Sequence, residues 1–220
     1  MGWKASTIII HNTSRVGDEK LLQELGFSKL TKIKDETFET VINPDDNKIY
    51  IGSYRDNIII CDSRIPMQFF EDEETLLEKK FKQVFPNSEV CAITLHSVVN
   101  LWGYSVVIDG KKARARAGSA DDGTFLEYGL PLAEEKELLS KSKLDNDGNR
   151  IYVFDDCPGE IFSEDQVGEN FVFSVCKRYF GEELDSADNE LFDTNLLGFR
   201  YKGFSKELRQ NHSKPWWKFW

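Results

Sequence analysis

A histidine, a serine and an asparagine lie close together near the middle of the chain, at His96, Ser97 and Asn100. An imidazole can act as a general base near neutral pH, because its ordinary pKa lies close to the physiological range. Asp121 follows in a polar turn and has the carboxylate that an orienting acid requires. We therefore predict a candidate catalytic set of His96, Ser97 and Asp121.

A second set of polar residues is predicted to bind a ligand beside His96. Arg114 and Arg116 would clamp an anion, and Glu127 is an alternative orienting acid. Asn100 would contribute its amide. His11 joins this set because residues 6–11 and 91–96 are two similar apolar segments that each end in histidine. This similarity places both histidines at equivalent strand ends.

The alternative for His96 is a core histidine whose ring nitrogens bond to the backbone, and the sequence favours it over catalysis. No nucleophile elbow, phosphate-binding loop or paired metal-ligand motif supports an enzyme. Two of the four cysteines would have to stand at C-x-x-C spacing to suggest zinc, and none do. A site made of His11, His96 and Asp62 is unsupported by spacing. We predict no metal and no cofactor.

A β-hairpin is expected to carry the two arginines. Residues 98–108 are rich in Val, Trp, Tyr and Ile, which favour strands. Asp109 and Gly110 then form a turn, and residues 111–117 alternate between Ala and Lys or Arg. This alternation predicts that the alanines face inward and that Lys112, Arg114 and Arg116 face outward, where they would attract an anion or a carboxylate.

Helices and strands are expected to alternate irregularly along the chain. Apolar spacing predicts helices over residues 17–25, 71–85, 133–141 and 163–180. Strands are predicted over residues 6–11, 38–42, 48–52, 57–61, 89–95, 124–128 and 151–154. This order indicates an α+β fold with a mixed or mostly antiparallel sheet and two or three packed helices.

Several short motifs resemble an uncharacterised bacterial domain family of unknown function. The start, Met1, Gly2 and Lys4, and the run His96-Ser97-Val98-Val99 fit its pattern. The turn of Asp109 and Gly110 with its basic strand fits as well, as do Gly129, Pro131 and Leu132, although Leu130 replaces the usual Glu before the proline. The resemblance covers about residues 1–135. It implies a cytoplasmic bacterial protein and supplies no activity.

The net charge of −10 is concentrated in one block of the sequence. Residues 155–193 hold twelve Asp or Glu and two basic residues, so the remainder of the chain is balanced. A negative chain does not favour binding to nucleic acid through phosphate neutralisation. An acidic face engaging a basic protein, as in an immunity protein or an inhibitor, fits this charge better.

We therefore expect an α+β domain over residues 1–140, an acidic extension over 141–205 packed on the same unit, and a Trp-rich basic tail over 206–220. The tail suits a membrane surface, a partner's groove or a return onto its own domain. No run approaches the 18 apolar residues of a membrane span. The absence of a signal peptide and the cysteine usage favour the cytoplasm.

Two hypotheses for function follow. The leading one is a cytoplasmic binding protein that uses its acidic face. The alternative is a small-molecule-binding enzyme, such as a hydrolase, with a site around His96.

Overall fold

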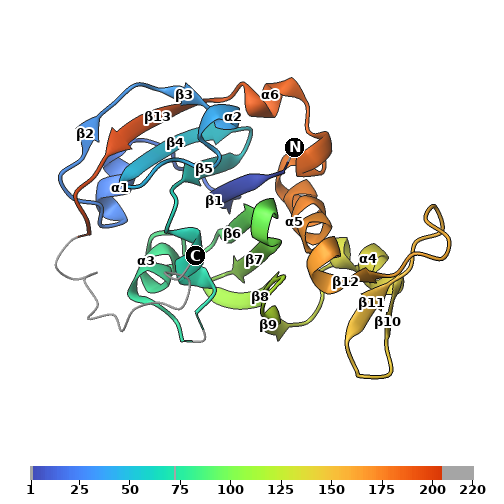
Figure 1. Cartoon of the computed structure of the whole chain (residues 1–220). Coiled ribbons are helices and arrows are strands. Elements are labelled where there is room, and N and C mark those ends of the chain that lie inside the picture. Colours follow the sequence, from blue (N-terminus) through green and yellow to red (C-terminus); the bar gives the residue numbers. More distant parts are fainter. Residues whose placement is uncertain (1, 72, 205–220) are drawn as a thin grey trace.

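The computed structural model describes residues 2–71 and 73–204, and one large antiparallel sheet runs through it (Figure 1). Its strands follow the order β2-β13-β4-β5-β1-β6-β7-β8-β9, and β3 pairs with β13 beside this path. Every pairing in it is antiparallel. The predicted α+β class with a mostly antiparallel sheet is therefore confirmed.

The strands of this sheet have the following bounds: β1 Lys4–His11, β2 Thr31–Lys32, β3 Glu36–Thr37, β4 Lys48–Tyr54, β5 Asn57–Cys61, β6 Glu89–His96, β7 Leu101–Ile108, β8 Lys111–Ser119, β9 Gly123–Gly129 and β13 Asn195–Arg200. The short helices are α1 Glu19–Glu24, α2 Phe38–Val41, η1 Pro66–Phe69, α3 Leu76–Val84, η2 Ser97–Val99, η3 Ala133–Glu135, α4 Lys136–Ser140, η4 Leu184–Ser186 and α6 Asn189–Phe192. The longest helix is α5, Glu164–Phe180.

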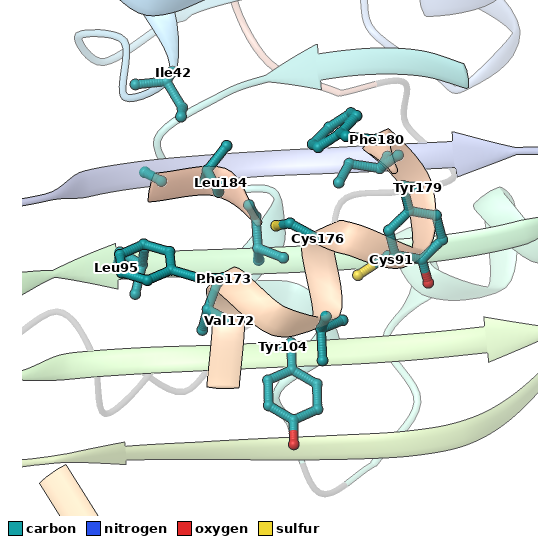
Figure 2. Close-up of a cluster of buried hydrophobic side chains, with 14 of the residues drawn as sticks. Ile42, Cys91, Leu95, Tyr104, Val172, Phe173, Cys176, Tyr179, Phe180 and Leu184 are labelled. Atoms are coloured by element: carbon teal, nitrogen blue, oxygen red, sulfur yellow. The ribbon is translucent and has the colours of Figure 1, made fainter. Parts of the chain in front are cut away.

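Helices cover both faces of the sheet. On one face, α5 packs Val172, Phe173 and Cys176 against Tyr104 and other buried residues of the central strands (Figure 2). On the other face, α1 and α3 contribute a second buried cluster. Because neither face of the central strands meets solvent, β1 is apolar at consecutive positions, with Ile8, Ile9 and Ile10 all fully buried.

The sequence pattern predicts α5 well. Ser163 precedes it, and the Ser163 amide donates a 2.9 Å hydrogen bond to the side chain of Gln166, the reciprocal half of a capping box. Gly181 ends the helix with a φ of 86°, a left-handed conformation that glycine adopts without strain. The predicted helix over 163–180 is confirmed to within one residue.

Residues 38–42 and the basic residues of β8 differ from the expectations. Residues 38–42 are not a strand: the helix α2 begins at Phe38, and its buried Phe38 and Val41 share one helical face. The basic residues of β8 do not all face solvent, because Arg114 and Arg116 are 1% and 0% exposed. The alternating pattern reveals two faces but not whether both are covered, and here the arginine face lies beneath η3 and the start of α5.

A second, small sheet extends away from the main body (Figure 1). It contains β10 Ser142–Leu144, β11 Arg150–Tyr152 and β12 Phe162–Ser163 in that order. Within the described residues, no helix is long and apolar enough to cross a membrane. The Trp-rich tail over 206–220 lies outside the described residues, and the cytoplasmic location stays a prediction.

Gly168 in the middle of α5 sets how closely this helix approaches the sheet. A Cβ built on Gly168 would lie 2.1 Å from the indole ring of Trp102, which is itself 1% exposed. Trp102 also stacks on Phe171, so its ring is held from a second side. The glycine is therefore required by the contact and not by helix propensity.

We predict that Gly168→Ala destabilises the protein by about 1–3 kcal/mol, through overpacking against Trp102. Helix propensity alone predicts the opposite sign, a gain of about 1 kcal/mol. Urea unfolding decides between them, with Asn170→Ala on the exposed side of α5 as the control. A more stable Gly168→Ala protein would contradict this close contact.

Candidate functional site

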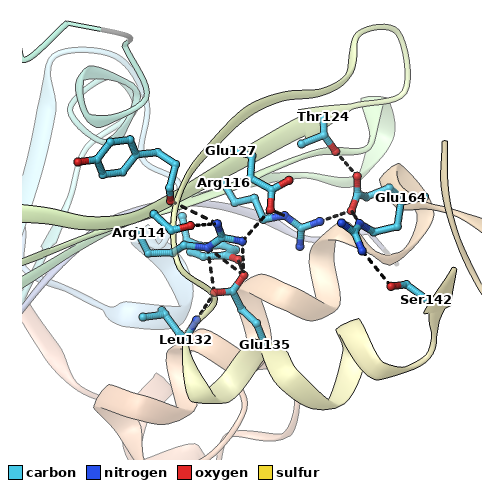
Figure 3. Close-up of polar contacts among 12 residues, drawn as sticks. Arg114, Arg116, Thr124, Glu127, Leu132, Glu135, Ser142 and Glu164 are labelled. Atoms are coloured by element: carbon cyan, nitrogen blue, oxygen red, sulfur yellow. Dashed lines mark hydrogen bonds and ion pairs between the residues drawn. The ribbon is translucent and has the colours of Figure 1, made fainter. Parts of the chain in front are cut away.

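A network of buried arginines and carboxylates lies between β8, β9, η3 and the start of α5 (Figure 3). Its central pair is Arg114 and Glu135, which are 1% and 0% exposed. The Arg114 Nη2 and Nε atoms donate to the Glu135 carboxylate at 2.7 and 3.0 Å. The same carboxylate accepts from the Tyr104 hydroxyl at 2.5 Å and from the Leu132 amide at 2.5 Å. Four donors thus fill both oxygens of Glu135.

The second arginine is held differently. Arg116 forms an ion pair with Glu164, the first residue of α5, and its guanidinium carbon lies 4.4 Å from the centre of the Phe171 ring. Thr124 and Tyr152 also donate to Glu164, at 2.5 and 2.9 Å. One carboxylate therefore joins β8, β9 and the small sheet to the helix.

Burial and charge act against each other in this network. Burial lowers the pKa of Arg114 and Arg116, but Glu135 and Glu164 outweigh it, so each arginine has a raised pKa and stays charged. Burial, reinforced by Glu135, raises the pKa of Tyr104. The Tyr104 hydroxyl therefore keeps its proton and acts as a donor.

The structure brings together three of the predicted ligand-binding residues. Glu127 lies 3.1 Å from Arg114 Nη2 and 3.6 Å from Arg116 Nε. The carboxylates that the two arginines attract therefore belong to the chain itself. Glu135 and Glu164 were not among the predicted site residues. The only signal for Glu164 was its place in the acidic first turn of a helix, which the helix dipole explains equally well.

The remaining predicted residues are elsewhere. His11 and His96 do not lie near each other: in the antiparallel pairing of β1 with β6, His11 faces Glu89 and His96 faces Lys4. Seven residues of strand, or about 23 Å, separate the two positions. Asp121 is in an exposed turn, and within the described residues no hydrogen bond or ion pair links it to His96.

Ser97 and Asn100 form hydrogen bonds that connect η2 and the residue after it to the N-terminal segment and to α5. The Ser97 hydroxyl accepts from the Trp3 amide at 2.7 Å and lies 2.6 Å from a Glu169 carboxylate oxygen. Asn100 donates to Asp165 at 2.9 Å. His96 Nδ1 is buried and has no hydrogen-bond partner among the described residues. The geometry therefore gives Ser97 a partner other than the histidine that would activate it.

A groove with a volume of about 580 Å³ lies beside the second half of α5, and we call it the acidic groove. Its charged lining comes from three segments: Glu134, Glu137, Lys177, Arg178, Glu183 and Asp185. Phe173 and Leu138 form apolar parts of the wall. The volume is within the range of about 300–1,000 Å³ typical of ligand sites.

Some charges in the acidic groove are already paired. Arg178 donates to Glu89 at 3.0 Å and to one oxygen of Glu134 at 3.2 Å. The other oxygen of Glu134 is buried and has no hydrogen-bond partner among the described residues. Glu137 and Asp185 are exposed. The groove thus has carboxylates in excess of the cations available to them.

Comparison with known proteins identifies a family but no activity. Residues 14–145 match a family of unknown function, DUF6928. No curated protein and no solved structure matches the chain. The predicted resemblance to an uncharacterised family is confirmed.

We predict that Glu135→Gln destabilises the protein by about 3–5 kcal/mol, because Arg114 would keep a buried charge without its main partner. The double variant Arg114→Met/Glu135→Leu removes both charges and should recover most of the loss. Guanidinium unfolding measures both.

Asp155→Asn is the matched control, since this carboxylate is 96% exposed and its ion pair with Lys141 is at the surface. Its unfolding midpoint should not change. Equal stability of Glu135→Gln and the parent protein would show that the buried pair does not hold η3 to the sheet.

Proposed function

We propose that this chain, a member of the DUF6928 family of unknown function, is a binding protein whose acidic groove holds a basic segment of a partner protein. The family itself supplies no activity. The observation that carries this proposal is the excess of carboxylates over cations in the wall of the groove, where Glu137 and Asp185 are exposed. A cationic side chain from a partner would pair with these exposed carboxylates.

The groove also suits the shape of a lysine or arginine side chain. Phe173 and Leu138 offer apolar contact for the methylene stem, while Glu137 and Asp185 lie at the exposed positions where the charged head would remain. Among the described residues, no three His, Cys, Asp or Glu side chains are arranged to hold a metal ion. The apolar wall and the exposed carboxylates of the groove support an organic cation as the ligand.

The enzyme hypothesis has less support. It needs a base that reaches a nucleophile, and the Ser97 hydroxyl is engaged by Trp3 and Glu169. His96 and Glu89 are at opposite ends of β6, and Glu89 is the residue that anchors Arg178 in the groove. His96 is thus remote from the proposed binding site.

We predict that Glu137→Gln/Asp185→Asn weakens binding of a fluorescein-labelled hexaarginine peptide about three- to tenfold, since two exposed ion pairs are lost. Fluorescence anisotropy at low salt measures the affinity. Added salt should reduce it further, because exposed charges are screened.

Two controls make this test specific. Glu39→Gln/Asp109→Asn changes the net charge equally at exposed positions outside the groove, and it should keep the parental affinity. His96→Ala should also keep it. If both double variants lose the same affinity, the peptide responds only to net charge and the proposed site is wrong.

A further inference from the structure

The small sheet and its connecting loops, residues 142–163, form an arm, which has one face against the main body and one face away from it. The arm is fixed to the main body at its base: Arg150 Nε lies 3.3 Å from Glu164, and the Tyr152 hydroxyl donates to the same carboxylate at 2.9 Å. Tyr152 is fully buried and meets Phe171 of α5 edge to face. One face of the arm is therefore occupied by the body of the protein.

The opposite face of the arm is apolar and exposed. Ile151 pairs with Ser163, and Tyr152 pairs with Phe162. Side chains alternate along a strand, so Ile151 points away from the body when Tyr152 points toward it. Val153 and Ile161 each lie one residue beyond these two pairs, and they are 36% and 62% exposed. Ile151, Val153 and Ile161 thus form an outward apolar strip.

Acidic residues border this strip at both ends. Asp145 and Asp147 lie in the turn between β10 and β11. The loop between β11 and β12 adds three exposed acids: Asp155, Asp156 and Glu160. Two lysines are also near: Lys143 pairs with Ile151 across the strands, and Lys141 forms an ion pair with Asp155. Carboxylates still outnumber these cations.

An apolar centre within a charged rim is the usual composition of a protein interface. We propose that the outward face of the arm is a second docking surface for the basic partner, covered by a segment in which Lys or Arg flank apolar side chains. The charge of the acidic rim selects that partner and speeds its approach, while the apolar strip supplies contact area. The arm proposal deepens the proposed function, and it rests on that function for the charge of the partner.

The test uses the full chain and two labelled peptides: Lys-Ile-Lys-Ile-Lys-Ile-Lys, which suits the arm, and hexaarginine, which suits the acidic groove. Ile161→Ser should weaken binding of the lysine–isoleucine peptide about tenfold, because an exposed apolar contact is removed. It should not alter hexaarginine affinity. The groove variant Glu137→Gln/Asp185→Asn should affect hexaarginine far more than the lysine–isoleucine peptide.

Val16→Ser is the matched control, since Val16 is 68% exposed and lies outside the arm. Asp155→Asn/Asp156→Asn should also weaken the lysine–isoleucine peptide, and Glu39→Gln/Asp109→Asn should not. Equal effects of Ile161→Ser and Val16→Ser would overturn the arm proposal while leaving the groove result to stand. Loss of self-association in Ile161→Ser, seen by analytical ultracentrifugation, would also overturn it, because the strip would then be covered by a second copy.

Discussion

The need to neutralise two buried guanidinium groups determines the arrangement of the layers on one side of the sheet. Arg114 and Arg116 stand side by side on β8 with almost no exposure, and a buried charge without a partner costs several kcal/mol. Glu135 can reach Arg114 only if η3 lies over β8, and Glu164 can reach Arg116 only if α5 begins there. The acidic groove and the arm then follow, since η3 leads into one wall of the groove and Glu164 holds the base of the arm.

The same pairs link the family-matched region to the residues after it. Arg116 lies within residues 14–145, but its main partner Glu164 lies beyond them. Strand β13, also outside that range, pairs between β2 and β4 in the main sheet, and α5 supplies much of one hydrophobic cluster. The segment 14–145 therefore lacks the strands β1 and β13, the covering helix α5 and the counter-ion of Arg116. Strand β13, helix α5 and Glu164 thus pack directly on strands of the family-matched region.

Local signals allowed the sequence to predict much of the fold but little of the site. The hairpin at Asp109-Gly110 and the capped helix α5 depend on residues near each other in the chain, and both were predicted. The burial of Arg114 depends on Glu135, which is 21 residues away in the sequence and belongs to the helical turn η3. No local sequence pattern indicates that these two residues form a pair. The expected proximity of His11 and His96 failed for a related reason: similar segments were taken as equivalent strand ends, whereas β1 and β6 run antiparallel. Segment similarity says nothing about strand direction.

The acidic block of the sequence divides into separate surfaces once the chain is folded. Glu164 is used inside the network, where it is paired with Arg116, and one carboxylate oxygen of Glu169 accepts a hydrogen bond from Ser97. Among the exposed carboxylates that remain, those of residues 155–160 lie on the arm near the start of α5, and Asp185 lines the groove near its end. Three others, Asp188, Glu190 and Asp193, lie in or beside α6. The two ends of α5, a helix of 17 residues, lie about 25 Å apart.

Exposed ion pairs are individually weak, at about 0.2–1 kcal/mol each, so neither group of carboxylates would hold a partner strongly by itself. Two groups on one chain make the second contact intramolecular, and the overall affinity for the partner then rises without any new type of interaction. Such a pair of groups favours a partner whose basic segments match their spacing over a cation that offers charge alone.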